Sequence, residues 1–172
     1  NTIYLSGTSS GATFSTAGIY HTYHASAVVL DLRNNIIVNV TAPKGTGQAV
    51  AFQRSAATNL NNYSLASNNN LFYAGTPSAT NLIFYNGSSY QYLSSFITVV
   101  TPTRVTLSVS VNPVFISTVG SSNDFLKIDP SIPTLVESRG VNITGITTDF
   151  EAEIRQGNAG YMGIRIAPDI GA

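Results

Sequence analysis

Asn35-Ile36-Ile37-Val38 is the middle copy of a pattern that occurs three times in this sequence of 172 residues. The other copies are Asn1-Thr2-Ile3-Tyr4 and Asn70-Leu71-Phe72-Tyr73, and the three starts lie 34 and 35 residues apart. A period of this length is typical of solenoid repeats, in which each repeat packs on its neighbours. The pattern therefore predicts an all-β fold, a right-handed parallel β-helix solenoid of short coils with an irregular closing C-terminal segment.

The asparagine that opens each copy has a predicted structural role. In stacked coils, equivalent positions lie one strand spacing apart, about 4.8 Å. Amide side chains at that spacing can hydrogen-bond the coils above and below as a ladder. Asparagine also tolerates the left-handed backbone that a bend requires. Asn1, Asn35 and Asn70 are therefore predicted to form an asparagine ladder.

Short runs of β-branched and aromatic residues, separated by Asn, Ser, Thr and Gly, predict the individual strands. The predicted strands cover residues 3–5, 27–30, 36–38, 49–52 and 71–73. Apolar residues alternate with Thr and Ser over 105–111, which predicts a further, half-buried strand. Over 88–100 the apolar spacing is helical but strong helix formers are few, so a short helix and a loop both remain open.

The length of the chain suits a single domain over residues 1–172. Within it we expect repeat coils over 1–87, an insertion or longer loop over 88–112, and closing coils over 113–172. The sequence begins at Asn1 without a methionine, so we expect a processed product or part of a longer chain or assembly. A β-sandwich is the alternative fold, and it would show antiparallel pairing instead of parallel, in-register coils.

The composition excludes several function classes. Charged residues make up 9% of the chain, and 8 basic and 8 acidic residues give a net charge of +0. No basic stripe is present to contact phosphates, so nucleic acid is excluded as a partner. No window approaches the ~18 apolar residues that cross a bilayer, so no membrane insertion is expected. The absence of cysteine rules out disulfides and thiol chemistry, and it suits an exported bacterial protein.

Two stretches in the first half resemble known proteins. A typical coil of right-handed β-helix proteins of the pectin-lyase-like superfamily resembles Leu30-Asp31-Leu32-Arg33-Asn34-Asn35-Ile36-Ile37-Val38-Asn39. Large bacterial surface proteins, many of them exported by the type IX system, contain stretches similar to Ser67-Asn68-Asn69-Asn70-Leu71-Phe72-Tyr73-Ala74-Gly75-Thr76-Pro77. The resemblance implies a β-helix and a secreted location, and it implies little about activity because one fold hosts many functions.

The C-terminal third carries the most specific part of this resemblance. The closing phrase of the family is similar to Asp124-Phe125-Leu126-Lys127-Ile128-Asp129-Pro130 followed by Ile132-Pro133 and Gly140. Its terminal signature is similar to Thr148-Asp149-Phe150-Glu151 with Arg155, Gln156-Gly157-Asn158-Ala159-Gly160-Tyr161 and Ala167-Pro168-Asp169-Ile170-Gly171-Ala172. The chain departs from the signature at Ala152, where the family usually has glycine. The family also usually continues past the terminal signature with acidic residues, so a C-terminal sorting domain is expected to be removed or absent.

Three acidic residues form the first candidate site. Asp149, Glu151 and Glu153 alternate, so on an extended strand all three would project to one side. They would then supply a carboxylate pair of the kind used in glycoside hydrolysis, or a calcium site. We expect instead a solvated acidic edge, with Arg155 as a partner. No catalytic residue is assigned, and calcium is the only cofactor that the pattern suggests.

Other polar and aromatic groups were weighed in the same way. Asp31 and Arg33 share one strand face and are expected to form an exposed ion pair rather than a catalytic base and clamp. His21 and His24 lie three residues apart in a strand and loop context, so no metal site is expected there. The candidates for stacking on sugars are Tyr20, Tyr23, Tyr90 and Tyr92, although tyrosine on strands also suits packing between coils.

Together these observations predict a non-catalytic, extracellular or cell-surface module with a structural or adhesive role. The end coils of a solenoid leave strand edges unpaired. The expected partners are therefore neighbouring copies stacked end to end as a filament, or the rest of a longer surface protein. The alternative is a carbohydrate-binding or polysaccharide-degrading module, for which glycans would be the partners.

Overall fold

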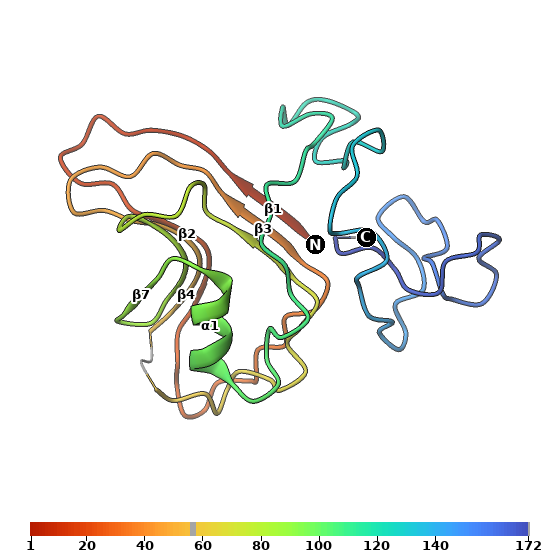
Figure 1. Ribbon diagram of the computed structural model, residues 1–172, viewed down its shortest axis with the longest axis horizontal. Helices are drawn as coiled ribbons and strands as arrows, with labels where there is room; N and C mark the ends of the chain where they lie inside the picture. Colours follow the sequence, from red (N-terminus) through yellow and green to blue (C-terminus); the bar gives the residue numbers. More distant parts are fainter. Residues whose placement is uncertain (56–57, 172) are drawn as a thin grey trace.

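The structure, a computed structural model, describes residues 1–55 and 58–171 and contains a parallel sheet built from the three copies of the asparagine pattern. The strands of this sheet are β1 (Thr2–Leu5), β3 (Ile36–Asn39) and β5 (Leu71–Tyr73), in the order β1-β3-β5 (Figure 1). Ile3 pairs with Ile37, and Ile37 pairs with Phe72. The copies of the pattern therefore lie in register.

A second sheet has four strands and mixed pairing. Its members are β2 (Thr16–His21), β4 (Ala49–Arg54), β6 (Asn81–Tyr85) and β7 (Ser89–Tyr90), in the order β2-β4-β6-β7. The first three strands are parallel, and β7 turns back to pair antiparallel with β6. Helix α1 (Leu93–Val100) follows directly and lies beside this sheet (Figure 1). Of the two alternatives for residues 88–100, a short helix or a loop, the structure shows the short helix.

The predicted β-helix solenoid is wrong. The described residues form two small sheets, one of them mixed, together with one short helix, and no strand follows α1 up to residue 171. Residues 113–171 contain turns and isolated antiparallel bridges, such as the one between Phe115 and Ile128. Many of these turns are closed by side chains: the Asp129 carboxylate accepts hydrogen bonds from the backbone N–H and the hydroxyl of Ser131. Such local bonds compete with extended backbone, so the repeat does not continue.

Most of the individual strand predictions are confirmed. Strands β1, β3, β4 and β5 lie where the β-prone runs placed them. Residues 27–30 do not form a strand, and only Leu30 makes a bridge, to Tyr63. The antiparallel pairing expected of a β-sandwich occurs, among the named strands, only between β6 and β7.

The strand predicted over 105–111 is also wrong. The backbone turns at Val105, which has a φ of 64°, and Leu107 is 62% exposed instead of lying on the buried face. The side chain of Asn68 stabilises this turn: its Oδ1 accepts a hydrogen bond from the Leu107 N–H, and its Nδ2 donates to the Thr103 carbonyl. Only Val109 joins a sheet, through a bridge to Leu71.

An aromatic core fills the space between the two sheets and α1. Phe52 of β4 and Phe72 of β5 lie with ring centroids 6.3 Å apart, so the inner faces of the sheets are in contact. Phe96 of α1 stacks on Phe84 of β6 at 4.2 Å and meets Phe72 edge-on at 5.5 Å. Phe96 and Val100 are the buried residues of the helix, and their spacing of four places them on one face.

The outer face of the β1-β3-β5 sheet is covered by the C-terminal segment, defined as residues 113–171. Ile36 and Val38 alternate with Ile37 and project to the opposite face of β3. There they form a second apolar cluster with Val136 and Ile170. Strand β3 is therefore buried on both faces, which explains its continuous apolar sequence.

Close backbone contacts attach the C-terminal segment to this sheet. The Asn34 side chain donates a hydrogen bond to the Val141 carbonyl and accepts one from the Val141 N–H. A Cβ on Gly140 would lie 2.8 Å from the Pro168 carbonyl oxygen, and one on Gly171 would lie 2.5 Å from the Ile36 side chain. The close backbone contact requires glycine at position 140, and the φ of 91° favours glycine at position 171. In the described part of the chain, no helix is long and apolar enough to cross a membrane.

Candidate binding site

A cleft of about 1270 Å³ separates the edge of the β1-β3-β5 sheet from the C-terminal segment. Thr2 and Ile36 line it from the sheet side, and Phe125, Ile146 and Arg155 are among the residues that line it from the C-terminal segment. The segment lies beside β1 and β3, on the side away from β7 and α1 (Figure 1). The cleft is thus formed by parts of the chain that are distant in sequence.

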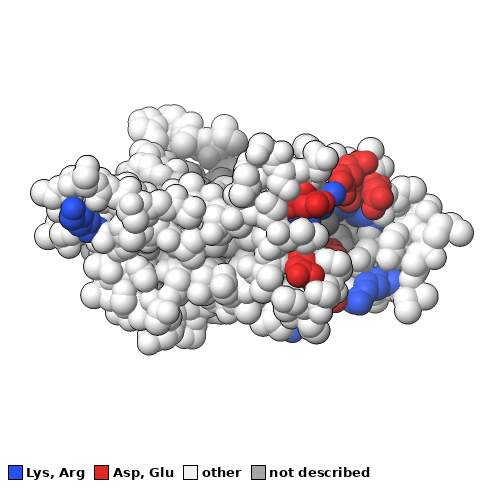
Figure 2. Space-filling model, turned by 90° about the horizontal axis from the view of Figure 1, so that it is seen from above, with Lys and Arg blue, Asp and Glu red and all other residues white. Residues whose placement is uncertain are grey.

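Charged side chains gather around this cleft. Figure 2 shows acidic and basic groups close together at one end of the molecule, while most of the remaining surface in that view carries no charge. The sequence has the same asymmetry, because seven of the eight acidic residues lie between positions 124 and 169. Those seven are Asp124, Asp129, Glu137, Asp149, Glu151, Glu153 and Asp169.

Arg155 is the most unusual residue of this region. Its side chain is buried, with 7% of its surface exposed, and it lines both the cleft and an adjoining pocket of about 290 Å³. Its Nε and Nη2 atoms have no hydrogen-bond partner among residues 1–55 and 58–171. Guanidinium donors that are buried in this way are almost always paired. Arg155 is therefore the first residue to consider for binding.

Two carboxylates lie near Arg155 but are already engaged by other groups. Asp149 accepts hydrogen bonds from the backbone N–H groups of Glu151 and Glu153, each at 2.9 Å. Asp169 accepts from the Ser138 N–H at 2.6 Å and from the Gln156 side chain at 3.2 Å. Burial lowers the pKa of Arg155, and the two carboxylates act in the opposite direction. The guanidinium remains a cation at neutral pH.

The smaller pocket combines polar and apolar walls. Besides Arg155 it is lined by Asp149, Glu153, Ile154, Gln156, Tyr161 and Asp169. Four of its lining residues, including Arg155 and Gln156, also line the cleft, so the two spaces adjoin. A volume near 300 Å³ is at the small end of ligand pockets.

The three predicted acidic residues do not lie on a strand. Asp149 opens a turn that passes through Ala152, with a φ of 65°, and closes at a bridge between Thr148 and Ile154. Asp149 and Glu153 line the small pocket, whereas Glu151 forms an ion pair with Lys127 at 2.8 Å. Within the described residues, no group of three or more His, Cys, Asp or Glu side chains is arranged to hold a metal ion. The calcium alternative therefore has no preformed cluster here.

None of the four candidate tyrosines lines the cleft, and they fall into two pairs, at or next to the opposite edge strands β2 and β7. Tyr20 is on β2 and Tyr92 is the N-cap of α1, and both are 56% exposed. Tyr90 stacks on Phe84 with centroids 5.7 Å apart, so it packs on the aromatic core. Tyr23 follows β2, and its backbone N–H donates to the Ser55 hydroxyl. The two pairs of tyrosines therefore belong to different edges of the β2-β4-β6-β7 sheet, and their role in stacking on sugars stays a prediction.

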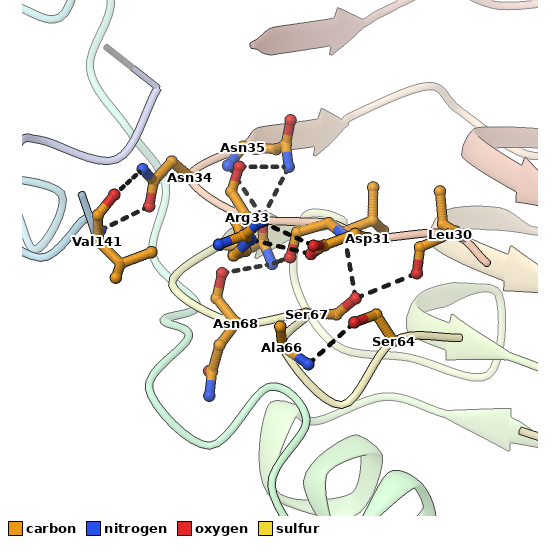
Figure 3. Close-up of polar contacts among 12 residues, drawn as sticks. Leu30, Asp31, Arg33, Asn34, Asn35, Ser64, Ala66, Ser67, Asn68 and Val141 are labelled. Atoms are coloured by element: carbon orange, nitrogen blue, oxygen red, sulfur yellow. Dashed lines mark hydrogen bonds and ion pairs between the residues drawn. The ribbon is translucent and has the colours of Figure 1, made fainter. Parts of the chain in front are cut away.

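The structure joins the asparagines of the ladder by hydrogen bonds. The Asn1 side chain donates to Asn35 at 3.2 Å, and the Asn35 side chain donates to Asn70 at 2.9 Å. The left-handed backbone positions are the preceding residues, Asn34 and Asn69, with φ of 58° and 56°. Figure 3 shows Asn34 turned toward Val141. Adjacent asparagines thus have two roles: one bonds along the sheet, and the other attaches the C-terminal segment.

The remaining candidate pairs have structural roles. Asp31 and Arg33 form an exposed ion pair at 2.8 Å, with a second contact of 3.0 Å from Nε (Figure 3). His21, on β2, accepts a hydrogen bond from the buried Arg54. His24 lies in the following loop and accepts from the Ser26 N–H.

Sequence reasoning found the neighbourhood of the site but not its central residue. The acidic alternation predicts Asp149 and Glu153, whereas Arg155 enters as their surface partner and as part of the terminal signature, not as a binding residue. The burial of Arg155 depends on packing between segments that the local pattern does not describe. No protein family, curated protein or solved structure matches this chain.

Proposed function

We propose that this chain is a non-catalytic, extracellular surface module that binds a ligand in the cleft between the β1-β3-β5 sheet and the C-terminal segment. The observation that carries the proposal is the cleft of about 1270 Å³ with a buried, unpartnered Arg155 in its wall. Binding sites are typically concave and combine apolar walls with a few polar groups. This cleft has both features.

The engagement of the cleft carboxylates supports binding rather than catalysis. Asp149 accepts two backbone N–H groups, Glu151 pairs with Lys127, and Glu137 pairs with Arg165 at 3.5 Å. A general acid or base needs a carboxyl group that is free to exchange its proton with the substrate. Carboxylates fixed by hydrogen bonds and cations are better suited to shaping a binding surface.

The extracellular location rests on the composition and on the resemblance to bacterial surface proteins. The surface is rich in Ser, Thr and Asn, and the chain lacks cysteine. These features fit a protein that functions outside the cell without disulfides.

The experiment compares ligand capture by the chain and by a variant with a filled cleft. Gly120 lines the cleft, and a Cβ at this position meets nothing within 4 Å, so Gly120→Trp is expected to fold. Val28→Trp is the matched control, because Val28 is 90% exposed and does not line the cleft. The probes are arrays of neutral oligosaccharides, acidic oligosaccharides and short peptides.

The proposal predicts capture of at least one class of probe, loss of capture in Gly120→Trp and unchanged capture in Val28→Trp. Capture that both tryptophan variants retain would place binding elsewhere on the surface. The absence of capture across all three classes of probe would argue against a binding module.

Self-association is a second candidate, favoured by the open edges of two strands. The outer edges of β1 and β2 have no strand partner among the described residues, whereas the edge of β6 is covered by β7 and β5 is bridged by Val109. Free edges invite pairing between copies. At the opposite ends of the sheets, β7 offers an edge of only two residues and β5 is bridged by Val109, so this geometry favours a pair of copies over a filament.

Sedimentation equilibrium tests the second candidate. Tyr20 is exposed on the edge strand β2, and Tyr20→Lys would place a charge where two edges meet. A concentration-dependent dimer that Tyr20→Lys abolishes is the expected result. A monomer at every concentration would rule out pairing through this edge.

A further inference from the structure

We infer that Arg155 is the binding residue of a carboxylate subsite in the small pocket beside the cleft. The inference rests on the proposed function, since it names the ligand chemistry of the same region. Its basis is the pair of unpartnered atoms of the guanidinium, Nε and Nη2, both buried.

Nε and Nη2 lie on one edge of the planar guanidinium, where their N–H bonds point in parallel. This edge is the fork that receives the two oxygens of a carboxylate in a bidentate pair. If Nε and Nη2 pointed in different directions, each could be satisfied by its own small partner, such as a water molecule. Because they are the two members of the fork, one planar group with two oxygens matches both at once.

Burial makes such a pair favourable. Arg155 is only 7% exposed, so water solvates its charge poorly, and this burial lowers its pKa. Charge-assisted hydrogen bonds strengthen when water is excluded. A ligand carboxylate would therefore supply the two hydrogen bonds that the described chain does not.

The chain's own carboxylates are held away from the fork. Asp149 is fixed by the backbone of its turn, and Asp169 by the Ser138 N–H and Gln156. Arg155 accordingly takes part in none of the ion pairs of the described residues, which involve Arg33, Lys127 and Arg165. Among residues 1–55 and 58–171, no group forms a hydrogen bond with the Nε and Nη2 atoms of this fork.

The same two carboxylates set the charge that the subsite accepts. Asp149 and Asp169 both interact electrostatically with Arg155, and Glu153 also lines the pocket, so an entering anion meets three negative charges beside one positive charge. A carboxylate carries a single negative charge, whereas inorganic phosphate at neutral pH carries on average about one and a half and is repelled more strongly. The site therefore discriminates against phosphate by repulsion.

The pocket volume of about 290 Å³ limits the size of what accompanies the carboxylate. Ile154 and Tyr161 provide the apolar part of the wall. A small free acid fits this space, and so does the terminal residue of a peptide whose remainder lies in the adjoining cleft. The shared chemistry is one carboxylate on a small apolar group.

The experiment follows the Arg155 Nε–H signal in a nitrogen-15 NMR spectrum of the whole chain during titration. The probes are propionate, an acetylated dipeptide with a free carboxyl end, the same dipeptide amidated, and inorganic phosphate. We expect a downfield shift of the Nε proton with free carboxylates at millimolar concentration, and none with the amide or with phosphate. A shift with both propionate and the free dipeptide identifies a site for small free acids. A shift with the free dipeptide alone identifies a site for the C-terminal residue of a peptide.

Arg155→Lys tests the role of the fork, because lysine keeps the charge but not the paired donors. We expect this variant to weaken carboxylate binding about tenfold or more. Arg139→Lys is the matched control, since Arg139 is exposed and lines neither the cleft nor the small pocket, and carboxylate binding by this variant should be unchanged. Should Arg155→Lys unfold, the titration of the unaltered chain still decides the question.

Two results would overturn the inference: an Arg155 Nε–H signal that no carboxylate shifts, or one that phosphate shifts as strongly as carboxylates do. Either result leaves the proposed function standing if the arrays still show capture that Gly120→Trp abolishes. If the arrays capture no probe and the NMR titration shows no shift, both the proposed function and the carboxylate subsite are contradicted.

Discussion

At the residue scale, Asn70 is the most heavily bonded member of the asparagine ladder. It is fully buried, and its amide donates to the carbonyls of Leu32 and Asn68. Its Oδ1 accepts from both the backbone and the side chain of Asn35, each at 2.9 Å. One side chain thus satisfies polar groups on two neighbouring segments, which would otherwise be buried without partners.

Asn70→Ala is expected to lower the free energy of unfolding by about 3 kcal/mol or more, because it leaves several buried polar groups unpaired at about 1–3 kcal/mol each. Urea denaturation measures the change. Asn61→Ala is the control, since Asn61 is exposed and should cost less than about 0.5 kcal/mol. Equal losses for the two variants would mean that the ladder does not stabilise the fold.

His21 provides a pH-dependent term at the same scale. Burial, and then the charge of Arg54, hold the pKa of His21 below its ordinary value of 6.5. The folded state therefore binds a proton less readily than the unfolded state does. The contribution of His21 is present above the ordinary pKa and is lost as the pH falls below it.

We expect the urea midpoint of the chain to fall between pH 7 and pH 5, and to fall less in His21→Asn. His24→Asn is the matched control, since His24 lies exposed in the loop, and it should keep the pH dependence of the original chain. Parallel pH profiles for the two variants would show that His21 does not carry the effect.

At the element scale, α1 closes the core between the two sheets. Phe96 is fully buried and contacts aromatic rings on β4, β5 and β6. The helix has no acidic residue in its first turn, no basic residue in its last, and no side-chain cap at Tyr92. Its eight residues are too few for a stable isolated helix, so tertiary packing must hold it.

Phe96→Ala is expected to cost about 3–5 kcal/mol, the usual range for a buried phenylalanine, and to release α1 from the sheets. Urea denaturation followed by circular dichroism measures the loss. Thr98→Ala, on the exposed side of the same helix, is the control and should change stability by less than about 1 kcal/mol. A cost for Phe96→Ala as small as that of the control would mean that α1 is not part of the cooperative core.

The elements that sequence predicts well are those whose apolar residues pack locally or in register. Strands β1, β3 and β5 repeat one pattern, and their parallel pairing follows from it. The alternation over 105–111 failed for a physical reason: Asn68, far back in the chain, bonds the Leu107 N–H and fixes a turn. The extended repeat failed similarly, because side chains such as Asp129 close turns in the C-terminal segment.

At the scale of the whole molecule, the C-terminal segment is held by a second apolar cluster and by Asn34. Ile170 is 2% exposed and lies with Ile36 and Val136, and its N–H donates to the Val136 carbonyl. The carboxylate subsite depends on this attachment, because Asp169 precedes Ile170 directly. The site therefore could not be predicted from the acidic alternation alone, although that pattern located Asp149 and Glu153.

Ile170→Ala is expected to loosen the C-terminal segment at a cost of about 2–4 kcal/mol. Amide hydrogen exchange should accelerate over residues 136–171, while the amides of β4 and β6 stay protected. Ile164→Ala is the control, because Ile164 is 98% exposed and should leave exchange unchanged. Uniform acceleration through both sheets would instead mean that the two clusters unfold as one unit.

The coverage of β3 on both faces affects how the chain folds during its synthesis. Ile36 leaves the ribosome long before Ile170, its neighbour in the second apolar cluster. At a synthesis rate of about 5–20 residues per second, the outer face of β3 stays uncovered for on the order of ten seconds, until Ile170 has been made. Throughout that time an apolar strand is accessible to other nascent chains, so the interval before Ile170 is made is the one most exposed to aggregation.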